Sequence, residues 1–209
     1  MLRIATALGL VLAPSAASAL IVTGAITGGT TLANGGTFQI IAPPLAAGAS
    51  SFQLPHLFAW NEKQNYTLLA PLTLDSGGTL PAGTRVASHA IVFDPKPRST
   101  VQATVEFNRP ILGILWRTRS LKDTDATLSV PPTVWSSPPT RGLEAGDIAG
   151  TSFSGKMLTI KEWTAGNPGD NIRVITTAIP EPTTWAMLIA GFGLIGFAAR
   201  QRRRNVTVA

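Results

Sequence analysis

The stretch VQATVEFN, residues Val101–Asn108, alternates apolar and polar side chains throughout its length. Alternation with a period of two places its apolar side chains on one face of a half-buried β-strand. Just upstream, Val86–Phe93 is a second β-rich run, and the segment Asp94–Arg98 between the two contains two prolines and is typical of a turn. We therefore predict an antiparallel hairpin formed by these two strands.

The rest of the middle of the chain has the same character. Gly- and Pro-rich breaks separate short apolar runs, and we find no convincing helical spacing in the interior. This pattern favours a mainly β fold, an antiparallel β-sandwich of which a jelly roll is one form. Ser129–Gly155 is the least regular segment, and we expect a long surface excursion or a sheet edge there. The further predicted strands are Thr37–Ile41, Tyr66–Leu74, Ile111–Trp116, Met157–Glu162 and Ile172–Thr176.

The N-terminus has the layout of a secretory signal peptide. Arg3 supplies one positive charge, Ile4–Pro14 is uncharged, and the small residues Ala17 and Ala19 stand at alternate positions before Leu20. This order predicts cleavage after Ala19 and export of the chain. A buried N-terminal helix is the alternative, but a core helix seldom lacks every charge after its third residue. We expect residues 1–19 to be the signal peptide and residues 20–179 the exported domain.

The basic character of the chain belongs to its ends. The net charge is +6, yet residues 20–179 contain twelve Lys and Arg against ten Asp and Glu, and these form no stripe. Nucleic-acid binding therefore has little support. The chain has no cysteine, which excludes disulfides, zinc-thiolate sites and cysteine nucleophiles within it. A domain of this size can be stabilised by burial alone.

The C-terminus joins a short apolar run to two flanking signals. The run Trp185–Ala199 carries no charge, and a helix of that length spans only about 22 Å, against roughly 30 Å of hydrocarbon. It is a marginal single transmembrane helix. An arginine cluster that follows such a run stays cytoplasmic, so the preceding domain lies across the membrane. On the other side, Pro180 and Pro182 hold Glu181 in an extended conformation that cannot join the helix.

This tail resembles the PEP-CTERM sorting signal of Gram-negative bacteria, in its W-A subclass, which is also described as the ice-binding protein C-terminal domain. The resemblance covers Pro180–Arg204, and residues 205–209 extend beyond the usual arginine end. No periodic threonine repeat of the kind found on ice-binding faces is present in the chain. The positions that carry the resemblance are Pro180, Glu181, Pro182, Trp185, Ala186, Gly191, Phe192, Gly193, Arg200, Arg202, Arg203 and Arg204.

The resemblance implies processing by an exosortase, an inner-membrane enzyme that acts in trans with its own cysteine nucleophile and cuts near the Pro-Glu-Pro element. The transiently anchored domain would then pass to the cell surface or into an extracellular polysaccharide matrix, commonly in a biofilm. The segments TRVASHAIVFDP, PILGILW and PGDNIRVIT are similar to parts of other proteins with this tail, whose activity is not established. That similarity implies a shared domain and no chemistry.

Candidate catalytic groups are few. His56 and His89 have no partner at a spacing that suggests metal ligation or a Ser-His-Asp relay, so we interpret both as structural. The chain contains no nucleophile elbow, zinc-protease motif or phosphate-binding loop. A pair of carboxylates for sugar hydrolysis cannot be nominated from spacing alone.

Two further groups of residues could bind ligands. Asp123 and Asp125 are an acidic pair that could hold a hard cation, together with Asp147 or Asp170–Asn171 from other loops. The alternative is a solvated turn. The tryptophans of the exported domain would offer sugar-stacking platforms if exposed, although core or rim packing is commoner for such rings. They are Trp60, Trp116, Trp135 and Trp163.

Together these features predict a non-catalytic, surface-sorted β-sandwich protein without a cofactor. Its expected partners are an exosortase, the membrane during transit and an exopolysaccharide, but no nucleic acid. One alternative is a carbohydrate-active enzyme with the same sorting signal. Another is a calcium-dependent adhesin.

Overall fold

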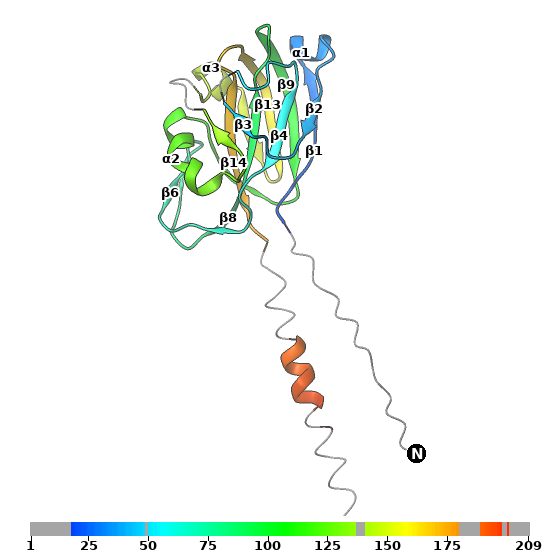
Figure 1. Cartoon of the computed structure of the whole chain (residues 1–209), viewed down its shortest axis with the longest axis vertical. Coiled ribbons are helices and arrows are strands. Elements are labelled where there is room, and N and C mark those ends of the chain that lie inside the picture. The colour runs from blue at the N-terminus through cyan, green and yellow to red at the C-terminus, as the bar shows by residue number, and fades with distance from the viewer. Residues whose placement is uncertain (1–17, 49, 137–140, 180–188, 198–199, 201–209) are drawn as a thin grey trace, which may run out of the picture. The chain divides into compact units, whose positions relative to one another are not determined.

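The computed structural model describes residues 18–48, 50–136, 141–179, 189–197 and 200. Residues Ser18–Ile179 form one compact unit. This unit is mainly β with antiparallel sheets, as the sequence predicts (Figure 1). The described tail residues 189–197 are helical.

The first of two main sheets contains the strand that opens the sequence analysis. Its strands run antiparallel in the order β1-β9-β13-β12. The alternating stretch forms β9, and its side chains at Val101, Ala103, Val105 and Phe107 are all completely buried, as predicted. The four strands are β1 (Ile21–Gly28), β9 (Ser99–Phe107), β13 (Met157–Ala165) and β12 (Thr151–Ser154).

The second sheet runs in the order β10-β14-β8-β4-β2, with β5 also paired to β8. The pair β2 and β4 is parallel and the other pairs are antiparallel. Its strands are β10 (Ile111–Leu115), β14 (Asp170–Thr177), β8 (Arg85–Phe93), β4 (Leu57–Asn61), β2 (Phe38–Ile40) and β5 (Tyr66–Thr67).

The main hydrophobic core lies between these two sheets. It combines side chains of the first sheet, such as Phe107 and Trp163, with side chains of the second, such as Ile91 and Val174. Apolar burial of this extent is the dominant stabilising term in a fold without disulfides. The two sheets are therefore layers that share one interior.

Helix α2 (Thr118–Leu128) covers the outer face of the second sheet. Its buried side chains Leu121 and Leu128 belong to a second apolar cluster, which also contains Leu115 of β10 and Ile175 of β14. The remaining short elements are α1 (Gly29–Ala33), β3 (Ala46–Ala47), β6 (Leu72–Thr73), β7 (Thr79–Leu80), β11 (Val134–Trp135) and α3 (Ala145–Ala149).

The predicted hairpin is wrong. Strand β8 lies in the second sheet and β9 in the first, so the Pro-containing segment 94–98 connects the two layers instead of closing a turn within one. Alternation reports that one face of a strand is buried, and it does not identify the neighbouring strand. Both strands bury their inner faces in the same core, but they do so from opposite sides.

The sequence also misses the helices α1, α2 and α3 and several strands. Helix α2 is eleven residues long and buries Leu121, Thr124 and Leu128, only two of which are apolar. Strands β1 and β4 were not predicted, and the predicted strand Tyr66–Leu74 divides into β5 and β6. The other predicted strands coincide with β2, β10, β13 and β14. Within its described residues, the irregular segment Ser129–Gly155 contains the short elements β11, α3 and β12.

Candidate functional site

Three carboxyl groups meet at one end of the two-sheet core. One carboxylate oxygen from each of Glu144, Asp147 and Asp170 lies within 4.8 Å of the other two. We call these residues the acidic cluster. Glu144 immediately precedes α3, Asp147 lies in the first turn of α3, and Asp170 is the first residue of β14.

Hydrogen bonds tie α3 to strand β13 and so fix the position of Asp147. Oδ1 of Asp147 accepts a hydrogen bond from the backbone N–H of Thr164 at 2.9 Å. The Thr151 hydroxyl donates to the carbonyl oxygen of Asp147 at 2.6 Å, and the Trp163 indole N–H donates to that hydroxyl at 2.7 Å. The buried Trp163 thus supports the acidic cluster from the core side.

Asp170 belongs to the inner face of β14. It pairs with Phe93 of β8, a core residue, and the alternation along β14 places it on the same face as Ile172 and Val174. Just before it, the backbone at Gly169 lies close to Asp94, since a Cβ atom on Gly169 would be only 2.6 Å from that residue. A carboxyl group is thereby held at the edge of an apolar interior.

Burial and like charge both act on this group. Asp170 is 2% exposed and Asp147 is 7% exposed, whereas Glu144 is exposed. Burial, followed by the like charge of the neighbouring carboxyls of Asp147 and Glu144, raises the pKa of Asp170 to about 9. Burial likewise raises the pKa of Asp147 to about 6, against the opposing effect of the Thr164 N–H. Such shifted carboxyls are more frequent at functional sites than elsewhere.

A cavity of about 210 Å³ opens beside the acidic cluster, and both Glu144 and Asp170 line it together with Arg98, Thr164 and Asn167. Arg98 is the nearby cation, since its charge lowers the pKa of Asp147 and Asp170. Within the described residues, however, no ion pair joins Arg98 to the three acids.

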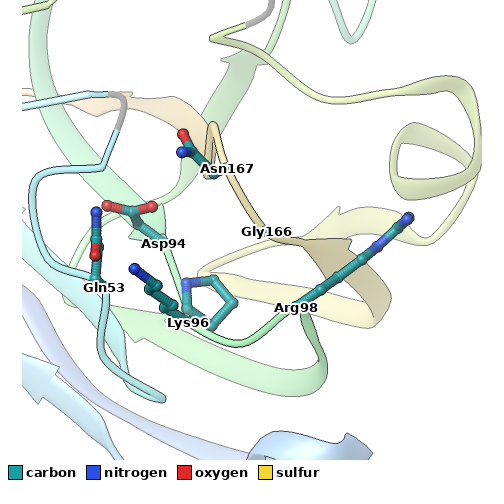
Figure 2. Close-up of a pocket in the computed structure, with 7 residues that line it drawn as sticks. Gln53, Asp94, Lys96, Arg98, Gly166 and Asn167 are labelled. Carbon is teal, nitrogen blue, oxygen red and sulfur yellow. The ribbon is translucent and has the colours of Figure 1, made fainter.

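A second cavity of about 210 Å³ adjoins the first and shares Arg98, Gly166 and Asn167 with it. Figure 2 shows Gln53, Asp94 and Lys96 on one side of it, while the Arg98 side chain extends away from them. Asp94 is 1% exposed; its Oδ2 accepts a hydrogen bond from the Phe52 N–H at 2.9 Å, and its Oδ1 has no partner. Two buried carboxylate oxygens on this side of the molecule, Oδ1 of Asp94 and Oδ2 of Asp170, therefore lack a hydrogen-bond partner.

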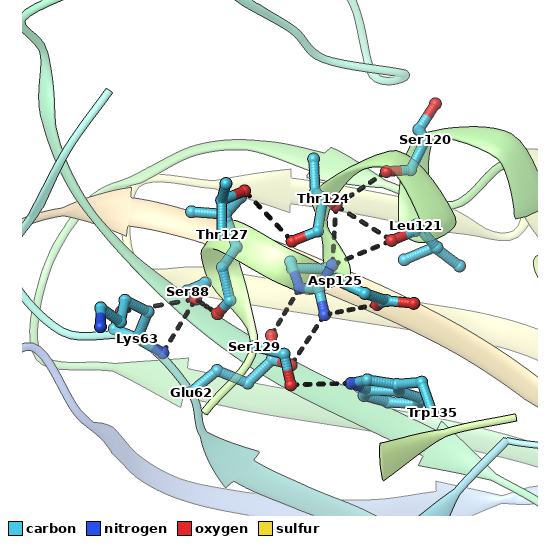
Figure 3. Close-up of polar contacts among 12 residues, drawn as sticks. Glu62, Lys63, Ser88, Ser120, Leu121, Thr124, Asp125, Thr127, Ser129 and Trp135 are labelled. Carbon is cyan, nitrogen blue, oxygen red and sulfur yellow. Dashed lines mark hydrogen bonds and ion pairs between the residues drawn. The ribbon is translucent and has the colours of Figure 1, made fainter. Parts of the chain in front are cut away.

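A different polar cluster lies on the outer face of the second sheet, beneath α2 (Figure 3). The guanidinium of Arg173 donates to both oxygens of Glu62, at 2.6 and 2.8 Å, and to Oδ1 of Asp125 at 3.1 Å. Arg141 donates to the same Asp125 oxygen at 2.9 Å and lies over the ring of Trp135, 4.0 Å from its centroid. We call Glu62, Asp125, Arg141 and Arg173 the arginine network.

Opposite charges balance within the arginine network. Burial alone would lower the pKa of Arg173, but the carboxylates of Glu62 and Asp125 raise it above its usual value. Arg173 is 1% exposed and Glu62 is 3% exposed. A buried arrangement in which each carboxylate meets a guanidinium, and in which Arg173 is fully hydrogen-bonded, is typical of a structural element.

The structure does not bring Asp123 and Asp125 into a common cation site. Asp125 is held by two arginines, and Asp123 is exposed and forms an ion pair with Arg119 at 3.6 Å. The expected helpers Asp147 and Asp170 do come together, but with Glu144, which the sequence analysis did not nominate. Asn171 points elsewhere, because its amide donates to the Arg141 carbonyl oxygen at 3.0 Å.

Both histidines have structural surroundings. His89 is completely buried and contacts the side-chain oxygens of Asn61 at 2.8 Å and Thr176 at 3.0 Å. Burial lowers the pKa of His89 to about 3, so it is neutral at ordinary pH. His56 bonds to the Thr37 N–H at 3.1 Å. Neither histidine belongs to the acidic cluster.

The tryptophans of this unit serve packing. Trp60 and Trp163 are completely buried, and Trp116 is 9% exposed. The Trp135 ring stacks on Trp60 at 5.4 Å and also lies beneath the guanidinium of Arg141. These four rings, all within the part of the chain that the structure describes, are therefore not the open platforms that sugar stacking requires.

The structure describes only part of the predicted sorting and cleavage positions. Gly191, Phe192 and Gly193 lie in the helical residues 189–197, where the Phe192 ring is exposed, and Arg200 is exposed as well. Ala19 is described and buried. Among the described residues, no helix is both long enough and apolar enough to cross a membrane. Positions outside the described residues are Ala17, Pro180, Glu181, Pro182, Trp185, Ala186, Arg202, Arg203 and Arg204.

Comparison with known proteins identifies the tail. The family model of the PEP-CTERM protein-sorting motif matches residues 178–204, which confirms the resemblance seen in the sequence. The chain thus carries a signal for export and for sorting toward the cell surface by an exosortase, a membrane protein. No curated protein and no solved structure matches the chain.

Proposed function

We propose that the chain is a non-catalytic β-sandwich protein that an exosortase delivers to the cell surface or to an extracellular exopolysaccharide matrix. The observation that carries this proposal is the sorting motif at residues 178–204. The signal-peptide pattern at residues 1–19 supports the same route, because it exports the domain to the side on which the processing element must lie. The core shared by the two sheets supports the β-sandwich class.

The chain's own contribution to sorting is the presentation of a cleavable segment. Pro180 and Pro182 disfavour helical geometry at the residues before them, and we expect this to make the sequence around Glu181 accessible to an enzyme. The apolar run from Trp185 and the arginines after it hold the chain in the membrane while the exosortase supplies the nucleophile. The match begins at residue 178, directly after β14 ends at Thr177.

A test follows from replacing Pro180, Glu181 and Pro182 together by alanine. In cells with a working exosortase, we expect the wild-type domain to be released from the membrane fraction at a size reduced by the tail. The triple variant should keep its full size and stay with the membrane. Antibody detection of the Ser18–Ile179 unit in membrane and surface fractions measures both outcomes. A wild-type chain that persists with its tail intact would contradict the proposal.

A carbohydrate-active enzyme with the same destination is the second candidate. It is favoured by one observation, the juxtaposition of carboxyl groups in a cavity with the pKa of Asp170 raised to about 9. Sugar hydrolysis uses such a protonated acid beside an ionised carboxylate. Incubation of the purified chain with polysaccharides separates the candidates, because only the enzyme releases reducing ends. We expect retention on polysaccharide without such release.

A further inference from the structure

We propose that Glu144, Asp147 and Asp170 bind a calcium ion at the end of the two-sheet core. This inference concerns the compact unit itself and goes beyond the sorting of the chain. The three carboxyl groups of the proposed site come from two parts of the chain that are distant in sequence. Glu144 and Asp147 belong to the start of α3, and Asp170 belongs to β14.

The distances fit a single ion. Calcium binds carboxylate oxygens at about 2.3–2.6 Å, so oxygens on opposite sides of the ion are roughly 5 Å apart. One oxygen from each residue of the acidic cluster lies within 4.8 Å of the other two. Small side-chain adjustments would therefore bring one oxygen of each carboxyl group into contact with a single ion.

The bonding state of Asp170 provides a second observation. Its Oδ2 atom is buried and has no hydrogen-bond partner, in a residue that is only 2% exposed. Leaving a buried carboxylate oxygen without a partner is costly, because its lost hydration is not replaced. Asp170 lines the cavity beside the cluster, so a cation placed there would supply the missing partner.

The donor atoms select the class of metal. All three side chains offer oxygen, the chain has no cysteine, and both histidines lie elsewhere. Oxygen-only sites suit hard cations. Calcium accepts six to eight oxygens in irregular geometry, whereas magnesium requires a nearly ideal octahedron. Glu144 is exposed and the cavity is open to water, so water molecules can complete an irregular coordination shell.

Without a bound cation, only a proton on Asp170 reduces the negative charge of the acidic cluster. Arg98 lines the same cavity, yet the described residues contain no ion pair between it and the acidic cluster. In the arginine network, by contrast, each buried carboxylate already has a guanidinium partner. An added cation would therefore interact more favourably with the acidic cluster than with the arginine network.

The experiment uses the full chain, purified in a mild detergent and stripped of metal with a chelator. At a pH of about 8, addition of calcium chloride to about 5 mM should raise the Tm by roughly 3–6 °C. Titration calorimetry on the same sample should show one calcium ion per chain. Both signals should be lost in Asp170→Asn and in Glu144→Gln, the second of which alters an exposed residue and leaves the core intact.

Asp123→Asn provides the matched control, because it removes an exposed carboxyl group outside the cluster. This variant should respond to calcium like the wild type. Absence of a calcium response in the wild type would overturn the proposal. So would a response of undiminished size in Asp170→Asn and Glu144→Gln, or an equal response to magnesium. Because no exosortase is involved, these outcomes are independent of the sorting experiment.

Discussion

The acidic cluster and the arginine network bury charge on opposite faces of the same strand. Asp170 and Arg173 are three residues apart in β14, so one points into the two-sheet core and the other toward α2. Arg173 meets carboxylates and is fully hydrogen-bonded, whereas Asp170 meets other carboxyls. Buried opposite charges stabilise each other, so a structural role is enough to account for them. Buried like charges repel, and a proton or a metal ion must offset that repulsion.

Removal of Arg173 should have the largest effect. Arg173→Met leaves Glu62 buried without its counter-ion, and breaking a buried pair in this way costs about 3–5 kcal/mol. Urea denaturation of the wild type and the variant measures the loss. The double variant Glu62→Gln/Arg173→Met should recover part of it. A loss of under about 1 kcal/mol would show that the arginine network is not structural in the sense argued above.

The acidic cluster should show the opposite response to pH from a buried ion pair. Between its unfolded value of 3.8 and its folded value of about 9, Asp170 keeps a proton only in the folded chain. Stability of the calcium-free chain should therefore fall as the pH rises through this window, by up to about 1.4 kcal/mol per pH unit. The charged groups that act on Asp170 are Asp147, Glu144 and Arg98.

The range above pH 6.5 isolates this effect. The pKa of Asp147 is raised only to about 6, and His89, whose folded pKa is about 3, reduces stability only as the pH falls below 6.5. Denaturation in calcium-free buffer from about pH 6.5 to 9 should show the decline in the wild type. It should be nearly flat in Asp170→Asn. Parallel slopes for the two chains would contradict the assignment to Asp170.

A smaller effect is expected from Arg98. Its charge opposes that of a bound cation in the shared cavity, so Arg98→Gln should tighten calcium binding roughly three- to tenfold. Titration calorimetry at low salt measures the change, and added salt should reduce it because salt screens the charge. Unchanged or weaker binding would show that Arg98 does not act on the acidic cluster.

The sequence predicts which side chains are buried better than it predicts which strands pair. The alternation at Val101–Asn108 identified a strand and its inner face, and the isolation of His56 and His89 indicated structural roles. The hairpin prediction failed because alternation contains no information on the partner strand. Helix α2 escaped notice because its buried face includes Thr124, so a polar residue occupies a position where an apolar one is expected.

The candidate site could be predicted only in part for a related reason. Asp123 and Asp125 attracted attention because only one residue separates them in sequence, but side chains two positions apart on a helix point in different directions. Asp147 and Asp170 were named only as helpers, and Glu144 not at all. Their meeting depends on how α3 packs against β12 and β13 beside the first residue of β14, which is a property of tertiary structure. The sorting motif of the tail could be identified without tertiary structure, because it is a linear sequence motif.

The position of β14 has a consequence for the fate of the chain. This last strand is an interior member of its sheet, hydrogen-bonded to β10 on one side and β8 on the other, and it ends at Thr177. Hydrolysis at or beyond Pro180 would leave that entire ladder in place. Cleavage there would therefore remove the sorting tail without disturbing the sheet, and the released domain would keep the same resistance to proteases and denaturation as its precursor.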